Sequence, residues 1–241
     1  FGVRPLFYWV SPDRKTLIYG SEVKAILAHP SVPARLDRRA ALHQLMQTIA
    51  PGMSAFEGIH SLAPGHFLRV RKQGGKLELK TVKYWDFDFP ADEVRRTSLR
   101  EPQEYIDQVR QELIRSIVLR LEADVPVGCY LSGGIDSCSI LGLATGAMQS
   151  STKAYTIAFD DDAYDESPIA KEMAESMNAD QELIRLRAED LYGENYIKTV
   201  WHAERTFYNT LGVAKNLMSR RVWDSGYRCV VTGEGADELF A

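Results

Sequence analysis

The stretch Leu131-Ser132-Gly133-Gly134-Ile135-Asp136-Ser137 follows a short apolar run at 127–131 and precedes a segment with helical character from about residue 137. Two adjacent glycines let the backbone approach a ligand closely, because they carry no Cβ. The free N–H groups at the start of the following helix then face an anion, and the hydroxyls of Ser132 and Ser137 add donors. The stretch therefore predicts a phosphate-binding loop between a strand and a helix.

This loop differs from two common nucleotide-binding loops. A Walker A loop ends in Lys-Ser or Lys-Thr, whereas no lysine lies between residues 131 and 148. The Gly-x-Gly-x-x-Gly spacing of dinucleotide-binding loops is also missing. Serines, backbone donors and an aspartate without a lysine suit a pyrophosphate leaving group. The alternative is a Gly-rich turn that binds nothing, and the combination of strand, loop and helix weakens it.

Strands and helices alternate around the loop. Strands are expected at 127–131, 154–159, 182–186 and 228–232, and helices at 104–121, from 137, at 168–177, 190–202 and 211–225. Such alternation predicts an α/β fold with a doubly wound parallel sheet. The helix at 104–121 has one apolar face, formed by Ile106, Val109, Leu113, Ile117 and Leu121.

The first ninety residues are β-rich. Strands are expected at 5–10 and 17–20, helices at 22–28 and 38–48, and a hairpin at 66–71 and 76–84 around Gly74-Gly75. Asp37 takes the N-cap position of the second helix, whose apolar stripe consists of Ala41, Leu42, Leu45 and Met46. Periodicity is lost between residues 85 and 101. We therefore predict two domains, 1–92 and 93–241.

The composition excludes several classes of protein. The 241 residues are 45% hydrophobic and 26% charged, as in globular proteins, and the net charge of −4 argues against a nucleic-acid partner. No apolar run approaches the ~20 residues of a membrane helix. Three scattered cysteines form no disulfide framework, so we expect a cytoplasmic protein without membrane contact. The ends at Phe1 and Ala241 suggest a piece of a longer chain.

Two motifs resemble known families. The Ser-Gly-Gly-Ile-Asp-Ser run at 132–137 is similar to the pyrophosphate loop of N-type ATP pyrophosphatases. The run Val-Thr-Gly-Glu-Gly-Ala-Asp-Glu-Leu-Phe at 231–240 resembles the signature of asparagine synthetase B-type enzymes, as does Asp-Val-Pro-Val-Gly at 124–128. Residues 1–8, 21–25 and 62–66 resemble the later part of an α+β class II glutamine amidotransferase domain.

The carboxylates of the second motif permit two interpretations from the residues alone. Asp237 and Glu238 follow a predicted strand, where ligands bind in open α/β sheets, and could hold Mg²⁺ beside a triphosphate. They could instead form an acidic N-cap for a helix that begins at Ala236. Similarly, Ile157 could contact adenine, as in the family, or belong to the apolar core.

The resemblance implies roles for further residues. ATP and its pyrophosphate would contact Leu131, Ser132, Gly133, Gly134, Asp136, Ser137, Ile157, Gly233 and Glu234. Asp136 and Asp237 would bind Mg²⁺. Asp136 and Glu234 would be catalytic, with Glu234 as a general base if burial raised its pKa. The nucleophilic cysteine of a class II amidotransferase lies at the protein's N-terminus, and none of Cys129, Cys138 and Cys229 corresponds to it.

The resemblance therefore predicts a glutamine-hydrolysing asparagine synthetase, with ATP, aspartate and glutamine or ammonia as small-molecule substrates. The enzyme would form a β-aspartyl-adenylate, release pyrophosphate and AMP, and could act as a homodimer. One alternative is a related adenylating enzyme of the β-lactam synthetase or lasso-peptide cyclase type, acting on another carboxylate. A second alternative is a non-catalytic scaffold, against which the two intact motifs argue.

Overall fold

The computed structural model describes residues 2–48, 51–88, 91, 100–148, 151–161 and 163–240. Contacts divide the chain into two units. Unit 1 contains Phe1–Ala91 and Ile197–Asn209, and unit 2 contains Asp92–Tyr196 and Thr210–Ala241. The domain boundary predicted at residue 92 adjoins residues 92–99, which lie outside the described residues, and it stays a prediction. The sequence did not indicate that residues 197–209 group with the first unit.

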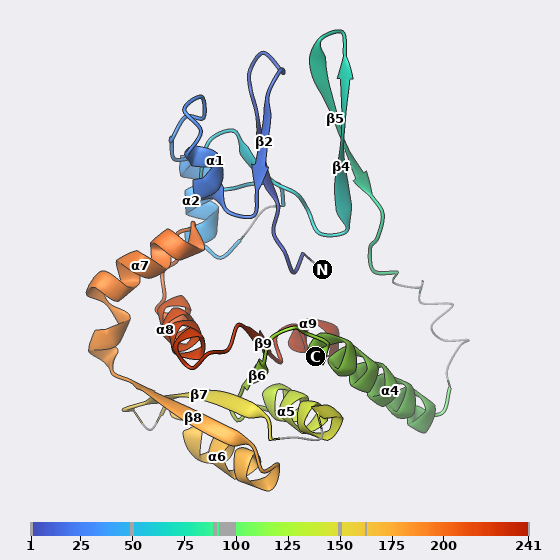
Figure 1. The fold of residues 1–241 in the computed structure, drawn as a ribbon, viewed down its shortest axis with the longest axis vertical. Helices are drawn as coiled ribbons and strands as arrows, with labels where there is room; N and C mark the ends of the chain where they lie inside the picture. The colour runs from blue at the N-terminus through green and yellow to red at the C-terminus, as the bar shows by residue number, and fades with distance from the viewer. Residues whose placement is uncertain are drawn as a thin grey trace. The chain divides into compact units, whose positions relative to one another are not determined.

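Unit 1 contains a small antiparallel sheet (Figure 1). Its strands are β1 (Phe7–Val10), β2 (Leu17–Gly20) and β3 (Ile59–Ser61), and they lie in the order β2-β1-β3. The helices α1 (Val23–Leu27) and α2 (Arg38–Leu45) lie between β2 and β3 in the chain. Trp9 of β1 and Ile59 of β3 pack with Val23 and Ile26 of α1 in one buried cluster. The strands and helices predicted here are confirmed, and the Asp37 carboxylate caps α2 by accepting from the Ala40 N–H at 3.0 Å.

The predicted apolar stripe of α2 is wrong. Leu42, Leu45 and Met46 are exposed, whereas Ala40, Ala41 and Gln44 are buried. The buried face meets the distant segment Ile197–Asn209, which belongs to the same unit. The Thr206 N–H donates to Gln44 Oε1 at 3.1 Å, and the Thr206 hydroxyl donates to the Ala41 carbonyl at 3.0 Å. The covered side of α2 therefore contacts a segment that is distant in the sequence.

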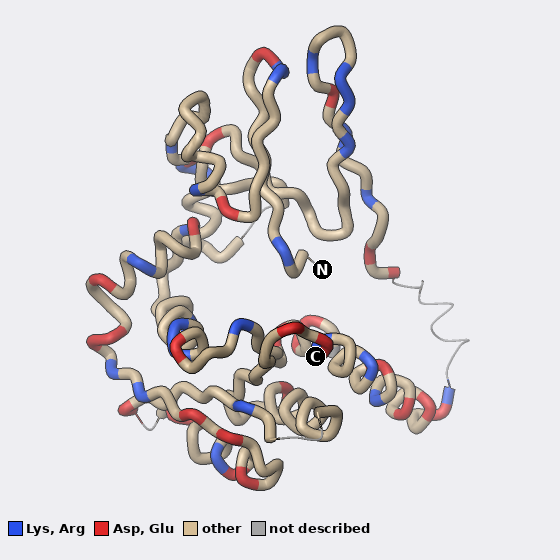
Figure 2. The backbone as a smooth tube through the Cα atoms, in the orientation of Figure 1, with Lys and Arg blue, Asp and Glu red and all other residues tan. Residues whose placement is uncertain are grey.

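The predicted hairpin is confirmed as β4 (His66–Gln73) and β5 (Lys76–Lys83). Gly74 and Gly75 have φ angles of 59° and 78°, the positive values that a tight type I′ turn requires. Figure 2 shows basic residues along both strands. Charges on a two-stranded sheet oppose the addition of another strand at its open edges.

Unit 2 is built on a four-stranded sheet in which every paired strand is parallel. The strands are β6 (Val127–Tyr130), β7 (Lys153–Phe159), β8 (Asp180–Leu186) and β9 (Cys229–Val231), in the order β8-β7-β6-β9. The chain runs outward from β6 to β8 and returns to pair β9 with the other side of β6. This reversal creates the crevice where ligands bind in open α/β sheets.

Helices cover both faces of this sheet (Figure 1). The unit contains α4 (Pro102–Leu121), α5 (Ile135–Met148), α6 (Ser167–Ser176), η1 (Ala188–Leu191), α8 (Leu211–Asp224) and α9 (Asp237–Phe240); α7 (Gly193–Ala203) runs across the division between the units. Cys129, Leu131 and Ala154 pack towards α5 and α6. Tyr155, the next residue on β7, packs towards Met218 and Val222 of α8. The predicted α/β fold with a parallel sheet is confirmed.

Among the described helices, none combines the length and the apolar character needed to cross a membrane.

Candidate functional site

A cavity of about 460 Å³ lies at the carboxyl ends of β6, β7 and β9. Its walls come from the loop after β6, the end of β7, the start of α8 and the loop after β9. The lining includes these residues predicted from the sequence: Leu131, Ser132, Gly134, Asp136, Ser137, Ile157, Gly233, Glu234, Asp237 and Glu238. The structure therefore brings two motifs together that are about a hundred residues apart in the chain.

The two loops touch at Gly233. A Cβ atom at this position would lie 2.8 Å from Asp136 Cβ and 2.9 Å from the backbone nitrogen of Ser137. Real Cβ atoms do not approach other atoms so closely, so only glycine lets the loop after β9 rest on the first turn of α5. Gly133 was also predicted as a site residue but is not among those that line the cavity. It has a φ of 92°, and its missing side chain leaves room for Glu166 and Ala170 at the start of α6.

The hydroxyls of Ser132 and Ser137 hold the 132–137 loop in shape. Ser137 Oγ donates to the Gly134 carbonyl at 3.0 Å and lies 3.0 Å from Ser132 Oγ, while the Ser132 N–H donates to Ser137 Oγ at 3.2 Å. The Gly134 N–H donates to Ser132 Oγ at 3.3 Å. In this arrangement both hydroxyl protons have acceptors inside the loop. The serines thus organise the loop, and their predicted role as ligand donors stays a prediction.

Backbone donors remain available at the start of α5. The first N–H groups of a helix have no partner within the helix. Within the described part of the chain, no hydrogen bond engages the N–H groups of Gly133, Ile135 and Asp136. They lie in the loop that lines the cavity, where they can bind an anion.

Glu234 lies at the edge of the cavity and pairs with Lys215 of α8. The Glu234 side chain is 69% exposed and that of Lys215 is 43% exposed. The predicted role of Glu234 as a buried base required a dry environment, and the structure does not provide one. The reason is its place on a short loop that faces the cavity opening rather than the sheet.

Asp136, Asp237 and Glu238 all line the cavity. Within the described residues, no three histidine, cysteine or acidic side chains come close enough to form a metal site by themselves. Mg²⁺ usually takes one or two carboxylates together with phosphate oxygens. Helix α9 begins at Asp237 rather than at Ala236, so Asp237 and Glu238 lie in its first turn instead of at the predicted N-cap, where their charges still favour a helix start.

Ile157 fits both of its predicted roles. It lines the cavity at the end of β7 and also packs against the cluster formed by Tyr155, Met218 and Val222. An apolar wall beside a predicted phosphate-binding loop is suited to a flat base.

Lys215 is a charged residue of the cavity that the sequence motifs did not predict. It lines the cavity from α8, together with Leu211 and Met218, at spacings of four and three residues. These spacings place the three side chains on one helix face. A charged residue inside an otherwise apolar helical stripe was the available signal.

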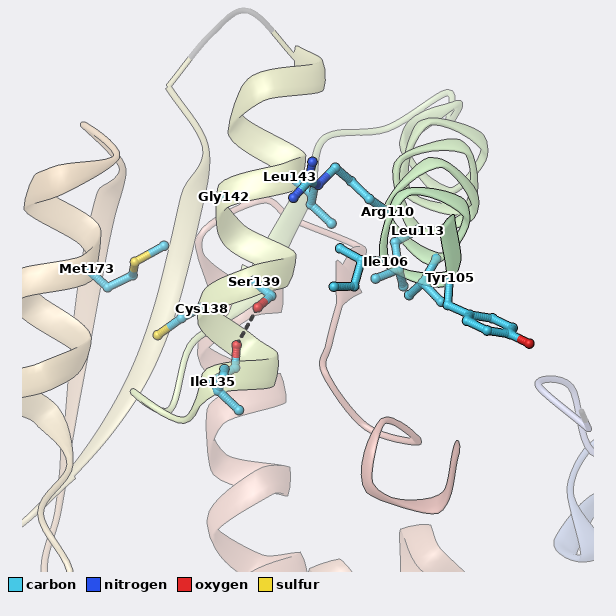
Figure 3. Close-up of a pocket in the computed structure, with 11 residues that line it drawn as sticks. Tyr105, Ile106, Arg110, Leu113, Ile135, Cys138, Ser139, Gly142, Leu143 and Met173 are labelled. Carbon is cyan, nitrogen blue, oxygen red and sulfur yellow. Dashed lines mark hydrogen bonds between the residues drawn. The ribbon is translucent and has the colours of Figure 1, made fainter. Parts of the chain in front are cut away.

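A second cavity of about 670 Å³ lies between α4, α5 and α6 (Figure 3). Ile106, Val109 and Leu113 of the predicted α4 face line it, opposite Leu143 of α5. Of that predicted face, only Ile117 is fully buried. The cavity is mostly apolar and contains no carboxylate, so it offers little of the chemistry that the motifs predict.

Comparisons with known proteins match both units. The sequence model of the family described as Asparagine synthase matches residues 108–241, and that of the Glutamine amidotransferase domain matches residues 1–85. Amidase chyE of Penicillium rubens is 32% identical over 255 residues, covering 100% of this chain and 36% of the relative. Asparagine synthetase [glutamine-hydrolyzing] 3 of Bacillus subtilis is 31% identical over 261 residues, covering 99% of this chain and 39% of the relative.

The chain thus spans well under half the length of these curated relatives. Among solved structures, an NH3-dependent NAD synthetase from Campylobacter jejuni is similar with a TM-score of 0.40 and 17% identity. That similarity covers 55% of this chain and 58% of the synthetase.

Proposed function

We propose an ATP-dependent amidation for this chain, which belongs to the asparagine synthase family. In detail, ATP would adenylate the side-chain carboxylate of aspartate at the 460 Å³ cavity, and ammonia derived from glutamine would displace AMP to give asparagine. Residues 1–92 would be the later part of a glutamine amidotransferase domain, and residues 93–241 the first part of the synthetase domain. The setting would be cytoplasmic.

The contact between the two loops at Gly233 is the observation that carries this proposal. A carboxylate is a poor electrophile, and adenylation gives it AMP as a leaving group. This chemistry needs a pyrophosphate cradle beside the place where the acyl group forms. The N–H groups of the 132–137 loop supply the cradle, and the loop after β9 lies directly against it.

The charges of the cavity support a role for Mg²⁺. Five carboxylates, of Asp136, Glu166, Glu234, Asp237 and Glu238, and one lysine line it, so its formal charge is −4. Such a lining repels a triphosphate unless cations are bound as well. We assign Asp136 and Asp237 as the residues that hold Mg²⁺ with the phosphate oxygens, where the ion would offset the charge that builds on the leaving pyrophosphate.

In this proposal Glu234 accepts a proton when ammonia attacks. Its exposed carboxylate lines the cavity and stands on the loop that meets Asp136 and Ser137, which supports this role. Exclusion of water around the adenylate would have to come from bound substrate or from other parts of the protein.

We keep a second candidate, in which the adenylated carboxylate is not that of aspartate, because the names of the relatives differ. The relative from Penicillium rubens is called an amidase, at an identity similar to that of the Bacillus subtilis synthetase. The same cavity chemistry would then adenylate a carboxylate other than that of aspartate.

Isotope exchange between ATP and pyrophosphate in the full-length protein tests the proposal. Exchange that depends on aspartate supports asparagine synthesis, and exchange that depends only on another carboxylate favours the second candidate. Asp136→Asn should abolish exchange without changing the thermal midpoint, since no hydrogen bond or ion pair of the Asp136 side chain is found in the described residues. Exchange at the wild-type rate in that variant would remove Asp136 from the site.

A further inference from the structure

Lys215 occupies a fixed position on the wall of the cavity. One turn later on the same face of α8, Ser219 Oγ lies 2.9 Å from the hydroxyl of Tyr130, at the end of β6. Met218, between them, is buried against Tyr155. These contacts dock α8 on the sheet, so that Lys215 lines the same cavity as residues of the 132–137 loop.

The 132–137 loop contains no cation of its own. No lysine or arginine lies within it, and its two serine hydroxyls already bond each other and the loop backbone. Of the described residues that line the cavity, Lys215 alone carries a positive charge. An ammonium group is a common phosphate ligand in nucleotide sites.

The present partner of Lys215 is easily exchanged. Both members of the Lys215–Glu234 pair are substantially exposed, and exposed pairs contribute little because water screens them. A phosphate oxygen carries more charge and forms stronger charge-assisted hydrogen bonds with an ammonium group. A triphosphate that enters the cavity therefore competes with Glu234 for the same lysine.

We propose that Lys215 is a phosphate-binding residue that leaves Glu234 for a phosphate oxygen when ATP binds. The exchange adds a positive charge to the phosphate site that the 132–137 loop forms. It also releases the Glu234 carboxylate, so that the base becomes available only when nucleotide is present. This inference rests on the proposed function, because it requires that the cavity bind ATP.

Equilibrium binding of Mg²⁺-ATP to the full-length protein, measured by calorimetry, tests the assignment. Lys215→Met should weaken ATP binding about tenfold, the loss expected for one charge-assisted hydrogen bond at a partly exposed site. Binding of adenosine, which has no phosphate, should not change. Arg220→Met is the matched control, because it removes one positive charge from an exposed position of α8 outside the cavity, and it should bind ATP like wild type.

Glu234→Gln separates phosphate binding from a purely structural role of the pair. If Lys215 binds phosphate, removing its competitor should tighten ATP binding by up to about fivefold, and should have no effect when Lys215 is already Met. If the pair only holds the loop after β9 in place, Glu234→Gln should weaken ATP binding as Lys215→Met does, and the inference is wrong. Equal ATP binding by wild type and Lys215→Met would also overturn it. A wild-type protein that binds no ATP would overturn the proposed function as well.

Discussion

Replacing Gly233 by alanine should separate the two loops of the cavity. The φ angle of Gly233 lies outside the left-handed region, so alanine can adopt its backbone conformation. The added methyl group would nevertheless lie 2.8 Å from Asp136 Cβ and 2.9 Å from two backbone atoms, the Asp136 carbonyl carbon and the Ser137 nitrogen. None of these atoms can rotate away, because all are fixed to the first turn of α5.

The size of the displacement follows from these distances. Ordinary contacts begin at 3.4 Å, so the loop after β9 must retreat by about 0.6 Å from its 2.8 Å contact. It is the loop that moves, since α5 is held by the fully buried Leu141 and Ala144. Overpacking of this kind costs about 1–3 kcal/mol. A 1 Å misplacement can cost about a hundredfold in rate, so a shift of this size should lower ATP–pyrophosphate exchange about tenfold or more.

Thermal unfolding and isotope exchange in the full-length protein measure the two effects separately. We expect the thermal midpoint of Gly233→Ala to lie below that of the wild-type protein. Gly134→Ala is the steric control for unfolding, because a Cβ there meets nothing closer than Ser132 Oγ at 3.4 Å. If Gly233→Ala exchanges at the wild-type rate and melts at the wild-type temperature, the close contact between the loops does not exist in solution.

Three further measurements examine other parts of the structure. Ser137→Ala should lower the free energy of unfolding in urea by about 2 kcal/mol, because the buried hydroxyl joins three hydrogen bonds. The exposed hydroxyl of Ser139 bonds only its own helix, so Ser139→Ala should cost less than about 0.5 kcal/mol, and equal losses would contradict the loop's hydrogen-bond network. Glu204→Gln should lower the thermal midpoint, because the Glu204 carboxylate accepts two backbone N–H groups of α1 and pairs with a lysine; a wild-type midpoint would refute this. Burial raises the pKa of the Cys129 thiol to about 12, so a thiol reagent at pH 8 should label the exposed Cys229 before Cys129. The free energy of unfolding should fall between pH 9.0 and about 12, because Cys129 loses its proton at a lower pH in the unfolded chain than in the folded protein. Equal labelling rates in the native protein would contradict that burial.

The features that the sequence predicted correctly depend on neighbours in the chain. Asp37 caps α2 by accepting from the backbone N–H three residues later, and Gly74-Gly75 closes a hairpin between adjacent strands. The run 127–131 contains consecutive buried residues because both faces of its strand are covered, as expected for a parallel sheet. In each case, local geometry and burial agree.

The features that the sequence did not predict depend on distant residues. The buried side of α2 contacts Thr206, more than 150 residues later, through two hydrogen bonds, whereas Leu42 and Leu45 lie on the exposed side. Lys215 reaches the cavity because α8 packs against β7, through Met218 and Val222. The direction of the Ser137 side chain could not be predicted from the sequence either, because it depends on the folded backbone of the loop. In the structure its hydroxyl forms hydrogen bonds within the loop.

Residues 197–209 affect how the gene for this protein can be divided or recombined. They belong to unit 1 by their contacts, although they are encoded far inside the second half of the chain. Glu204 supplies the acceptors for the first N–H groups of α1, and Thr206 covers α2. A crossover near residue 92 would therefore join these side chains to a foreign α1 and α2. Chimeras should fold well only when both halves come from the same parent, or when residues 204 and 206 are exchanged together with unit 1.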